Sequence, residues 1–376
     1  MTYKNIIYLV LLVTWFSCKS EIAKEEVPPK AKNVILLIAD GTGLSQLSSA
    51  FYFKKTIPNY TRFKHIGLIK TSSSREDITD SAAAATAFAT GEKTYNGAIG
   101  VADDSTKIKN LVEIVSLQYI KTGVISTSSI QHATPASFYA HVINRGLNED
   151  ITEDIVVSDI DFFAGGGTKF FNKRKDGKNL LEELKTKGFG IDTTALGDFA
   201  AIKQYSKMAY LLAENHMDPV AKGRGDFLPK ATELGIQFLS KDADNSNFFM
   251  MVEGSQIDWA GHENNAEYLI SELIDFDDAI GKALDFAEKD GNTLVIVTAD
   301  HETGGFTLAS TLKKTEDGNS YSDYKEITGS FSTNGHSATL IPVFAYGPGA
   351  EDFSGIYENT EIFHKILKVT NWNNKN

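Results

Sequence analysis

The sequence is poor in cysteine: of its 376 residues, only Cys18 is one. A chain with a single cysteine cannot form an internal disulfide, so the usual covalent means of stabilising an exported protein is excluded. Stability must come from the burial of apolar side chains, which make up 42% of the chain, and from any bound metal ions. With 23% charged residues, the composition is typical of a soluble globular protein.

Positive charge is also scarce. The 49 acidic residues outnumber the 37 basic ones, which gives a net charge of −12, and only five of the basic residues are arginine. This balance disfavours nucleic acids and anionic membranes, so neither is expected as a specific partner. Because arginine is rare here, an arginine near candidate catalytic residues is more noticeable than usual.

The sequence also lacks an apolar run long enough to span a bilayer stably. The apolar stretch at residues 6–16 follows a positive charge at Lys4 and precedes small residues, which predicts a targeting segment over residues 1–20. Two interpretations stay open: Cys18 is the lipid-modified first residue of a lipoprotein, or a peptidase cuts after Ser20. Both predict an exported protein, periplasmic or at the cell surface, with residues 21–32 as a polar tether.

Beyond residue 32, apolar runs typical of strands alternate with stretches of helical periodicity. The expected helices cover residues 82–90, 111–119, 180–187, 228–239 and 266–288. This alternation predicts an α/β fold with a mostly parallel central sheet flanked by helices on both faces. We expect a single domain over residues 33–370. Within it, residues 159–214 should form an irregular insertion at the edge of the sheet, and residues 311–334 a polar loop or small subdomain over the site.

Three acidic residues stand where strand-like apolar runs end. Asp40, Glu253 and Asp300 each close such a run, and His301 follows directly. Runs of this kind are typical of strands buried on both faces of a parallel sheet, and ligands bind beyond the carboxyl ends of such strands. Carboxylates gathered there must repel one another or share cations. The sequence therefore predicts a metal site, and a metal-dependent enzyme built around it.

An alanine-rich segment places a serine at the start of a helix. Asp80 or Ser81 can cap this helix, and Gly91 can end it. Free backbone amides at the positive end of the helix can bind an anion beside Ser81. A plain capping role is the commoner one for such a serine, so both interpretations stay open at this point.

Further candidate ligands lie in separate segments. Asp258 and His262 are four residues apart, which on a helix puts them on one side, where they can bind one ion. His336 precedes the last apolar strand. Thr134 offers a hard oxygen for Mg²⁺, and Arg145 a planar fork for two phosphate oxygens. Apart from His132, the remaining histidines are interpreted as structural: His65, His141, His216 and His364.

Together and in this order, these segments resemble the alkaline phosphatases, a family of phosphomonoesterases with two zinc ions and one magnesium. The resemblance runs from about residue 33 to residue 349. Its most specific parts are residues 79–87 (TDSAAAATA), 93–98 (KTYNGA), 252–258 (VEGSQID) and 297–301 (VTADH). It implies hydrolysis of small phosphate monoesters to an alcohol and inorganic phosphate.

The resemblance also implies a role for each site residue. Ser81 matches the nucleophile that becomes phosphoserine, Arg145 the group that binds phosphate, and Asp80 the carboxylate that orients Arg145. Three sets of metal ligands are implied: Asp258, His262 and His336 for one zinc; Asp40, Asp300 and His301, with Ser81, for the other; and Asp40, Thr134 and Glu253 for magnesium.

Two positions depart from the best-known enterobacterial pattern. His132 stands where that pattern has aspartate, and Trp259 where it has lysine. Both are expected beside the metal ligands, and the pair resembles other bacterial members. Larger members carry an elaborate insertion, called the crown, where this chain has only the short polar segment 311–334. A homodimer stays an open expectation, but contacts through such a crown are in doubt.

Two other functions compete with this one. The same metal frame could hydrolyse phosphodiesters or sulfate esters, but the Cys/Ser-x-Pro-x-Arg context of sulfatases is missing, and many nucleotide diesterases use threonine where this chain has Ser81. A non-catalytic zinc- or phosphate-binding surface protein would require loss of a ligand or of the serine, and none is lost.

Overall fold

The computed structural model describes residues 30–242 and 247–372. The predicted targeting segment, with Cys18 as its candidate for lipid modification, and most of the tether lie outside the described residues. None of the helices in the described part combines the length and the apolar character needed to cross a membrane.

Ten strands form the central sheet, in the order β14-β2-β13-β8-β1-β7-β3-β4-β6-β5. Neighbouring strands are parallel except where β13 pairs with β2 and β8. The predicted mostly parallel sheet is therefore confirmed. Along the chain, its strands are β1 (Asn33–Ala39), β2 (His65–Lys70), β3 (Lys121–Ser129), β4 (Phe162–Gly166), β5 (Phe189–Asp192), β6 (Lys207–Leu211), β7 (Phe248–Gly254), β8 (Thr293–Thr298), β13 (Ile341–Tyr346) and β14 (Gly355–Glu358).

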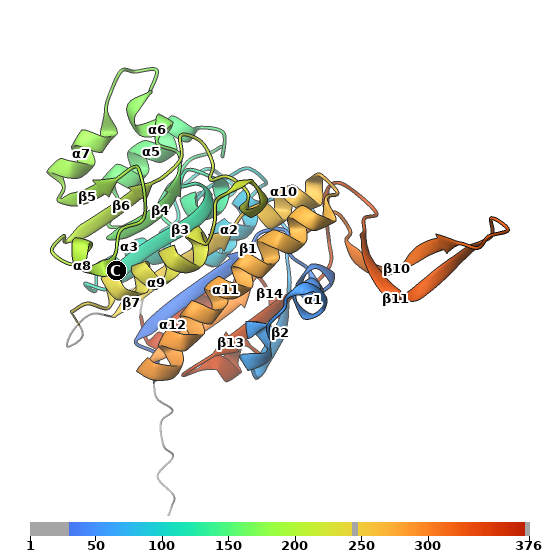
Figure 1. Ribbon diagram of the computed structural model, residues 1–376. Coiled ribbons are helices and arrows are strands. Elements are labelled where there is room, and N and C mark those ends of the chain that lie inside the picture. Colours follow the sequence, from blue (N-terminus) through green and yellow to red (C-terminus); the bar gives the residue numbers. More distant parts are fainter. Residues whose placement is uncertain (1–29, 243–246, 373–376) are drawn as a thin grey trace, which may run out of the picture.

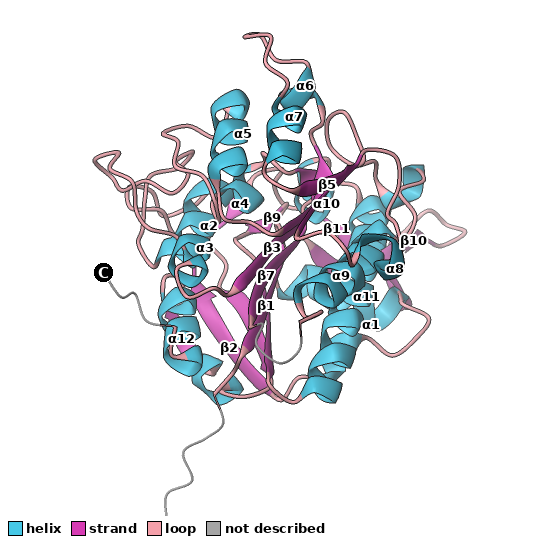
Figure 2. Cartoon of the chain, turned by 90° about the vertical axis from the view of Figure 1, so that its left-hand side faces the viewer, coloured by secondary structure: helices cyan, strands magenta, loops and turns pink. Residues whose placement is uncertain are grey.

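Helices cover both faces of the sheet (Figure 2). On one face lie α2 (Ser81–Thr90), α3 (Leu111–Ser116), α5 (Asn148–Val157), α7 (Leu180–Thr186) and α12 (Glu361–Thr370). On the other lie α1 (Leu44–Phe53), α9 (Phe227–Leu239) and α11 (Ala266–Asp290). Strand β1 shows why two cores form: Leu36 packs into the first and Leu37 into the second, because successive side chains point to opposite faces.

The register of the central strands brings the predicted acidic residues to one edge. Ile38 of β1 lies opposite Glu253 of β7 on one side and Thr298 of β8 on the other. Asp40 follows the end of β1, and Asp300 the end of β8. All three carboxylates therefore meet at the carboxyl ends of adjacent parallel strands.

Residues 159–214 differ from the prediction. They are not irregular: β4, β6 and β5 extend the parallel sheet at one end, and the short helices α6 (Lys169–Asn172) and α8 (Phe199–Ile202) lie among them. Phe162, Phe163 and Tyr210 in these strands are fully buried. The strands are only four or five residues long, and the polar loops between them hide their apolar pattern.

Residues 311–334, expected as a polar loop or small subdomain over the site, lie away from it for most of their length (Figure 1). Strands β10 (Thr307–Lys314) and β11 (Ser320–Ser330) pair as an antiparallel hairpin that points away from the body of the molecule (Figure 1). Only the return segment reaches the site, where the Asn334 carbonyl accepts a hydrogen bond from His262.

A buried arginine anchors the loop before α9 to α11. The Arg224 side chain is 0% exposed, and its Nη2 donates to Glu272 Oε2 at 2.6 Å and to Asp275 Oδ2 at 2.7 Å. Burial raises the pKa of Asp275 to about 6, and the guanidinium opposes that rise. The ionised carboxylates thus depend on this one cation.

Arg224→Met should lower the free energy of unfolding by about 3–5 kcal/mol at pH 8, because it leaves buried carboxylates without their cation. Lys185→Met is the matched control, since it breaks an exposed pair with Glu182 and should cost less than about 1 kcal/mol. Urea unfolding of both variants measures the difference, and equal losses would contradict the account.

Candidate metal centre and catalytic serine

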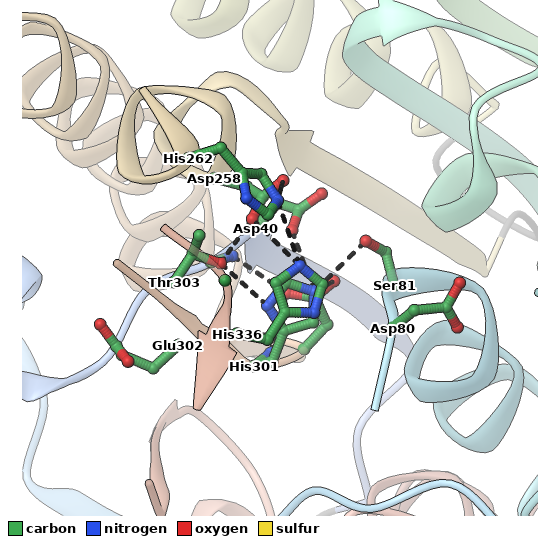
Figure 3. Close-up of polar contacts among 12 residues, drawn as sticks. Asp40, Asp80, Ser81, Asp258, His262, His301, Glu302, Thr303 and His336 are labelled. Atoms are coloured by element: carbon green, nitrogen blue, oxygen red, sulfur yellow. Dashed lines mark hydrogen bonds and ion pairs between the residues drawn. The ribbon is translucent and has the colours of Figure 1, made fainter. Parts of the chain in front are cut away.

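Ser81 is the first residue of α2. Asp80 caps this helix, since its Oδ1 accepts from the Ala83 amide at 3.0 Å, and Gly91 ends it in the left-handed conformation with φ of 77°. Ser81 is 2% exposed, and its Oγ lies 3.3 Å from His301 Nε2. The helix therefore holds a buried hydroxyl at its positive end, facing a histidine (Figure 3).

Asp258, His262 and His336 converge beside this serine (Figure 3). Asp258 and His262 lie one turn apart on α10 (Gln256–His262), with Oδ2 and Nε2 3.3 Å apart. His336 lies on the short strand β12 (His336–Ser337), which pairs with β9 (Glu302–Thr303). The Nε2 atoms of His262 and His336 are 3.2 Å apart, and the ring of His336 stacks on that of His301 at 3.5 Å.

Hydrogen bonds fix which nitrogen of two of these histidines is free. His262 Nδ1 lies 2.6 Å from the Asn334 carbonyl, and His336 Nδ1 lies 2.9 Å from the Thr79 carbonyl. A carbonyl can only accept, so each Nδ1 donates its proton, and the Nε2 of each neutral ring keeps a lone pair. Metal-binding histidines are usually held in this way. The contact with Asp258 raises the pKa of His262 to about 9, so a metal bound to its Nε2 would displace a proton. Two lone pairs only 3.2 Å apart repel each other unless a cation or a proton lies between them.

Asp40, Asp300 and His301 form a second group, whose ligand atoms lie within 4.8 Å of one another. All three residues are 0% exposed. Across the described part of the chain, neither oxygen of Asp40 nor Oδ2 of Asp300 has a hydrogen-bond partner. Burial and the charge of Asp300 raise the pKa of Asp40 well above its usual range. Buried polar atoms are nearly always paired, so these oxygens fit a cation.

Asp40 also belongs to a third group, with Glu253 and His132. Glu253 Oε2 accepts from Ser126 and Ser255, whereas its Oε1 has no partner within the described ranges. Burial raises the pKa of Glu253 to about 7. The Thr134 hydroxyl is buried beside Glu253. The oxygens of Asp40, Glu253 and Thr134 are hard ligands of the kind that Mg²⁺ prefers. His132 was expected only beside these ligands, but its ring is close enough to be a ligand itself.

Arg145 reaches this centre from the loop before α5. Its backbone amide donates to Gly97, and the Gly97 amide donates to Asp80 Oδ1 at 3.1 Å. Its guanidinium donates through Nη1 to Asp80 Oδ2 at 2.9 Å, and Nη2 lies 3.3 Å from His132 Nε2. Asp80 thus caps α2 and orients the arginine at once.

Two residues at the site were missed by the sequence analysis. The ring of His216 lies 5.7 Å from that of His132 and 4.8 Å from that of Trp259, although His216 was taken as structural. His216 follows the end of β6, a strand too short to be recognised in the sequence. It could therefore not be predicted to lie at the carboxyl edge of the sheet, where ligands bind. Thr303 lies between Asp258 and His301, and no motif singles out a threonine two residues beyond His301.

A sequence model of the family described as "Alkaline phosphatase" matches residues 31–322 and 309–372. The chain belongs to the alkaline phosphatase family. It is 34% identical to alkaline phosphatase 3 of Bacillus subtilis, over 92% of this chain and 90% of that protein. It is 31% identical to alkaline phosphatase of Escherichia coli K12, over 89% and 85% of the two chains.

A solved structure is more similar still. The alkaline phosphatase of the Antarctic bacterium TAB5 shares 67% identity and a TM-score of 0.89, over 92% of this chain and 99% of that one. A histidine-to-aspartate variant of the TAB5 enzyme carries magnesium in a site named M3. This member of the alkaline phosphatase family is therefore a phosphatase with metal-binding groups, and its α/β fold is that of its relatives.

Removal of the metal ions should make stability fall as the pH rises. In the metal-free protein the pKa of Glu253 is about 7, above its unfolded value near 4.5, so the native state holds more protons than the unfolded state between these pH values. Its stabilising contribution is present below pH 4.5 and is lost as the pH rises through 7. The expected loss is on the order of 3 kcal/mol, and Asp40 changes stability in the same direction.

Urea unfolding of chelator-treated and metal-loaded protein at pH 5 and pH 8 tests this expectation. The loaded protein should show the opposite trend, because metal binding displaces the protons. The same pH slope in both forms would show that these carboxylates do not hold the metals.

Proposed function

We propose that this alkaline phosphatase hydrolyses phosphate monoesters through a phosphoserine on Ser81, with two zinc ions and one magnesium. The observation that carries the proposal is the position of the Ser81 hydroxyl, buried at the start of α2 and 3.3 Å from His301 Nε2, beside buried carboxylate oxygens that lack hydrogen-bond partners in the described part of the chain. Donors of the right kinds surround it: imidazole nitrogens and carboxylates for zinc, and oxygens for magnesium.

The assignment of each metal follows the resemblance to the family, and the donor types of the residues fit it. We assign one zinc to Asp258, His262 and His336; the other to Asp40, Asp300 and His301, with Ser81; and magnesium to Asp40, Thr134 and Glu253. The imidazole nitrogens needed for the first zinc are free, since both Nδ1 atoms donate elsewhere. When bound, zinc supplies positive charge that favours a serine alkoxide and ionises water at neutral pH.

The side chains of the site perform the rest of the chemistry. The Ser81 oxygen attacks phosphorus, the bond from phosphorus to the alcohol oxygen breaks, and water then cleaves the phosphoserine to give inorganic phosphate. Arg145 presents two N–H groups to phosphate oxygens that gain charge in the transition state. Asp80 Oδ2 lies 2.9 Å from Arg145 Nη1 and holds the guanidinium in place. The arginine side chain therefore loses little conformational freedom when substrate binds.

Three chromogenic esters separate this function from its alternatives. The proposal expects turnover of p-nitrophenyl phosphate with release of inorganic phosphate, and much slower turnover of the bis(p-nitrophenyl) ester or of p-nitrophenyl sulfate. Faster turnover of the bis(p-nitrophenyl) ester would show that the protein is a diesterase, and faster turnover of p-nitrophenyl sulfate that it is a sulfatase. No turnover by zinc- and magnesium-loaded protein would favour a binding role.

Ser81→Ala should lower kcat for p-nitrophenyl phosphate by roughly 10³-fold or more, because no neighbouring group replaces the nucleophile. Acid quenching during turnover should trap phosphate on Ser81 of the wild type and on no residue of the variant. Retained binding of inorganic phosphate by the variant is the control for an intact site. A phosphate label on another residue would contradict the assignment.

His132 and Trp259 should leave the magnesium loosely held. Burial holds the pKa of His132 well below its usual range, so at pH 8 the ring adds no charge beside the third site. His132→Asp would add a carboxylate and should tighten magnesium, and Trp259→Lys would add a cation and should tighten phosphate and slow its release. The TAB5 variant with aspartate in place of histidine, which carries magnesium, supports this expectation.

The measurement is activity after dialysis against zinc-containing buffer without Mg²⁺. The wild type should lose activity and regain it slowly when Mg²⁺ returns, whereas His132→Asp should keep it. His364→Asp, which makes the same change at an exposed position, is the control and should behave as the wild type. Full activity of the dialysed wild type would contradict the account of the third site.

A further inference from the structure

Thr303 touches ligands of both proposed zinc sites. Its side chain is buried at 0% exposure between α10 and Gly41, in the segment that follows β1. Its Oγ1 forms a short hydrogen bond with Asp258 Oδ1 and lies 3.2 Å from His301 Nδ1 (Figure 3). Asp258 belongs to one proposed zinc site and His301 to the other, so a single hydroxyl joins the two.

The chemistry of these groups fixes the direction of both hydrogen bonds. A hydroxyl has one proton, and an ionised carboxylate can only accept, so Thr303 donates to Asp258. The same oxygen can then only accept from His301, whose Nδ1 must carry the ring proton. This leaves a lone pair on His301 Nε2, the atom that faces Ser81 Oγ at 3.3 Å and Asp300 Oδ2 at 3.3 Å.

The backbone of Thr303 adds two further links. Thr303 lies opposite His336 in the antiparallel pair of β9 and β12. Its amide donates to the Gly41 carbonyl at 3.0 Å, directly after Asp40. One residue therefore contacts Asp258, His301 and His336, which form one of the three groups whose ligand atoms lie within 4.8 Å of one another in the described part of the chain.

Two glycines hold the threonine in a narrow slot. A Cβ on Gly41, where φ is 73°, would lie 2.9 Å from Thr303 Oγ1 and 2.6 Å from the Asp258 Cα. A Cβ on Gly261 of α10 would lie 3.0 Å from Thr303 Cγ2. These distances are shorter than those that Cβ atoms normally keep, so a side chain at either position would displace Thr303. With glycine at both positions, the Thr303 side chain fits in one orientation.

We propose that Thr303 is a positioning residue that couples the two zinc sites, by fixing the His301 tautomer and the Asp258 carboxylate together. The inference rests on the proposed function, in which both residues are zinc ligands. Loss of the hydroxyl would leave His301 free to place its proton on Nε2, where it would block a metal. Asp258 would lose its donor at the same time, so both sites would weaken although Thr303 touches neither ion.

Matched substitutions separate the hydroxyl from the shape. Thr303→Val keeps the branched shape and removes the hydroxyl, whereas Thr303→Ser keeps the hydroxyl and removes the methyl. Thr303→Ala and Thr303→Ser differ from each other only by the hydroxyl. This second comparison replaces the first if the valine variant does not fold. Circular dichroism of the metal-free proteins checks folding.

The readouts are zinc dissociation constants, measured by chelator competition, and ¹⁵N spectra of histidine-labelled metal-free protein. Thr303→Val should weaken both zinc sites by about 10–100-fold, and kcat should fall more than KM changes. Wild type and Thr303→Ser should bind zinc alike and show His301 protonated on Nδ1, whereas Thr303→Val should show a mixture of tautomers.

Two results would overturn the inference while leaving the proposed function intact. One is wild-type zinc affinity in Thr303→Val, or in Thr303→Ala if that variant is used. The other is equal weakening in the serine and valine variants, which would show that packing and not the hydroxyl matters. If the wild type itself retains no zinc, the proposed function fails, and the role of Thr303 fails with it.

Discussion

Negative charge buried at one edge of the sheet is the constraint on which the rest of the structure depends. Asp40, Glu253 and Asp300 are all 0% exposed, and the in-register ends of β1, β7 and β8 force them together. An uncompensated buried charge costs several kcal/mol, so the folded chain must either protonate these groups or hold cations. The proposed metal binding, the pH-dependent stability and the proposed chemistry at Ser81 then have one physical origin.

The histidines connect this centre to distant parts of the chain. The Nδ1 atoms of His262, His336 and His301 point to oxygens of Asn334, Thr79 and Thr303 respectively. Each contact orients a ring, and those of His262 and His336 also join distant segments at the carboxyl edge, whereas Thr303 lies only two residues after His301. The orientation of these rings and the structure of the loops that contact them therefore stabilise each other. This explains how loops with few buried apolar side chains can hold a compact site.

Much of the fold and of the site could be predicted from the sequence, because the relevant signals are local. The long apolar runs of β1, β7 and β8, each closed by an acid, placed their residues at the sheet edge, and the spacing of Asp258 and His262 placed them on one helix face. The rest depended on pairing between distant segments. The short strands β4 to β6 carry too few residues to show a pattern, the polar hairpin β10–β11 exposes both faces, and His216 and Thr303 acquire partners only in three dimensions.

The most direct test of the central claim is anomalous diffraction at the zinc edge, from crystals grown at pH 8 with zinc, magnesium and phosphate. We expect two zinc peaks, one among Asp258, His262 and His336 and one among Asp40, Asp300 and His301. We also expect a third ion without zinc signal beside Glu253 and Thr134. Carboxylates paired through shared protons, with no metal between them, would contradict this claim.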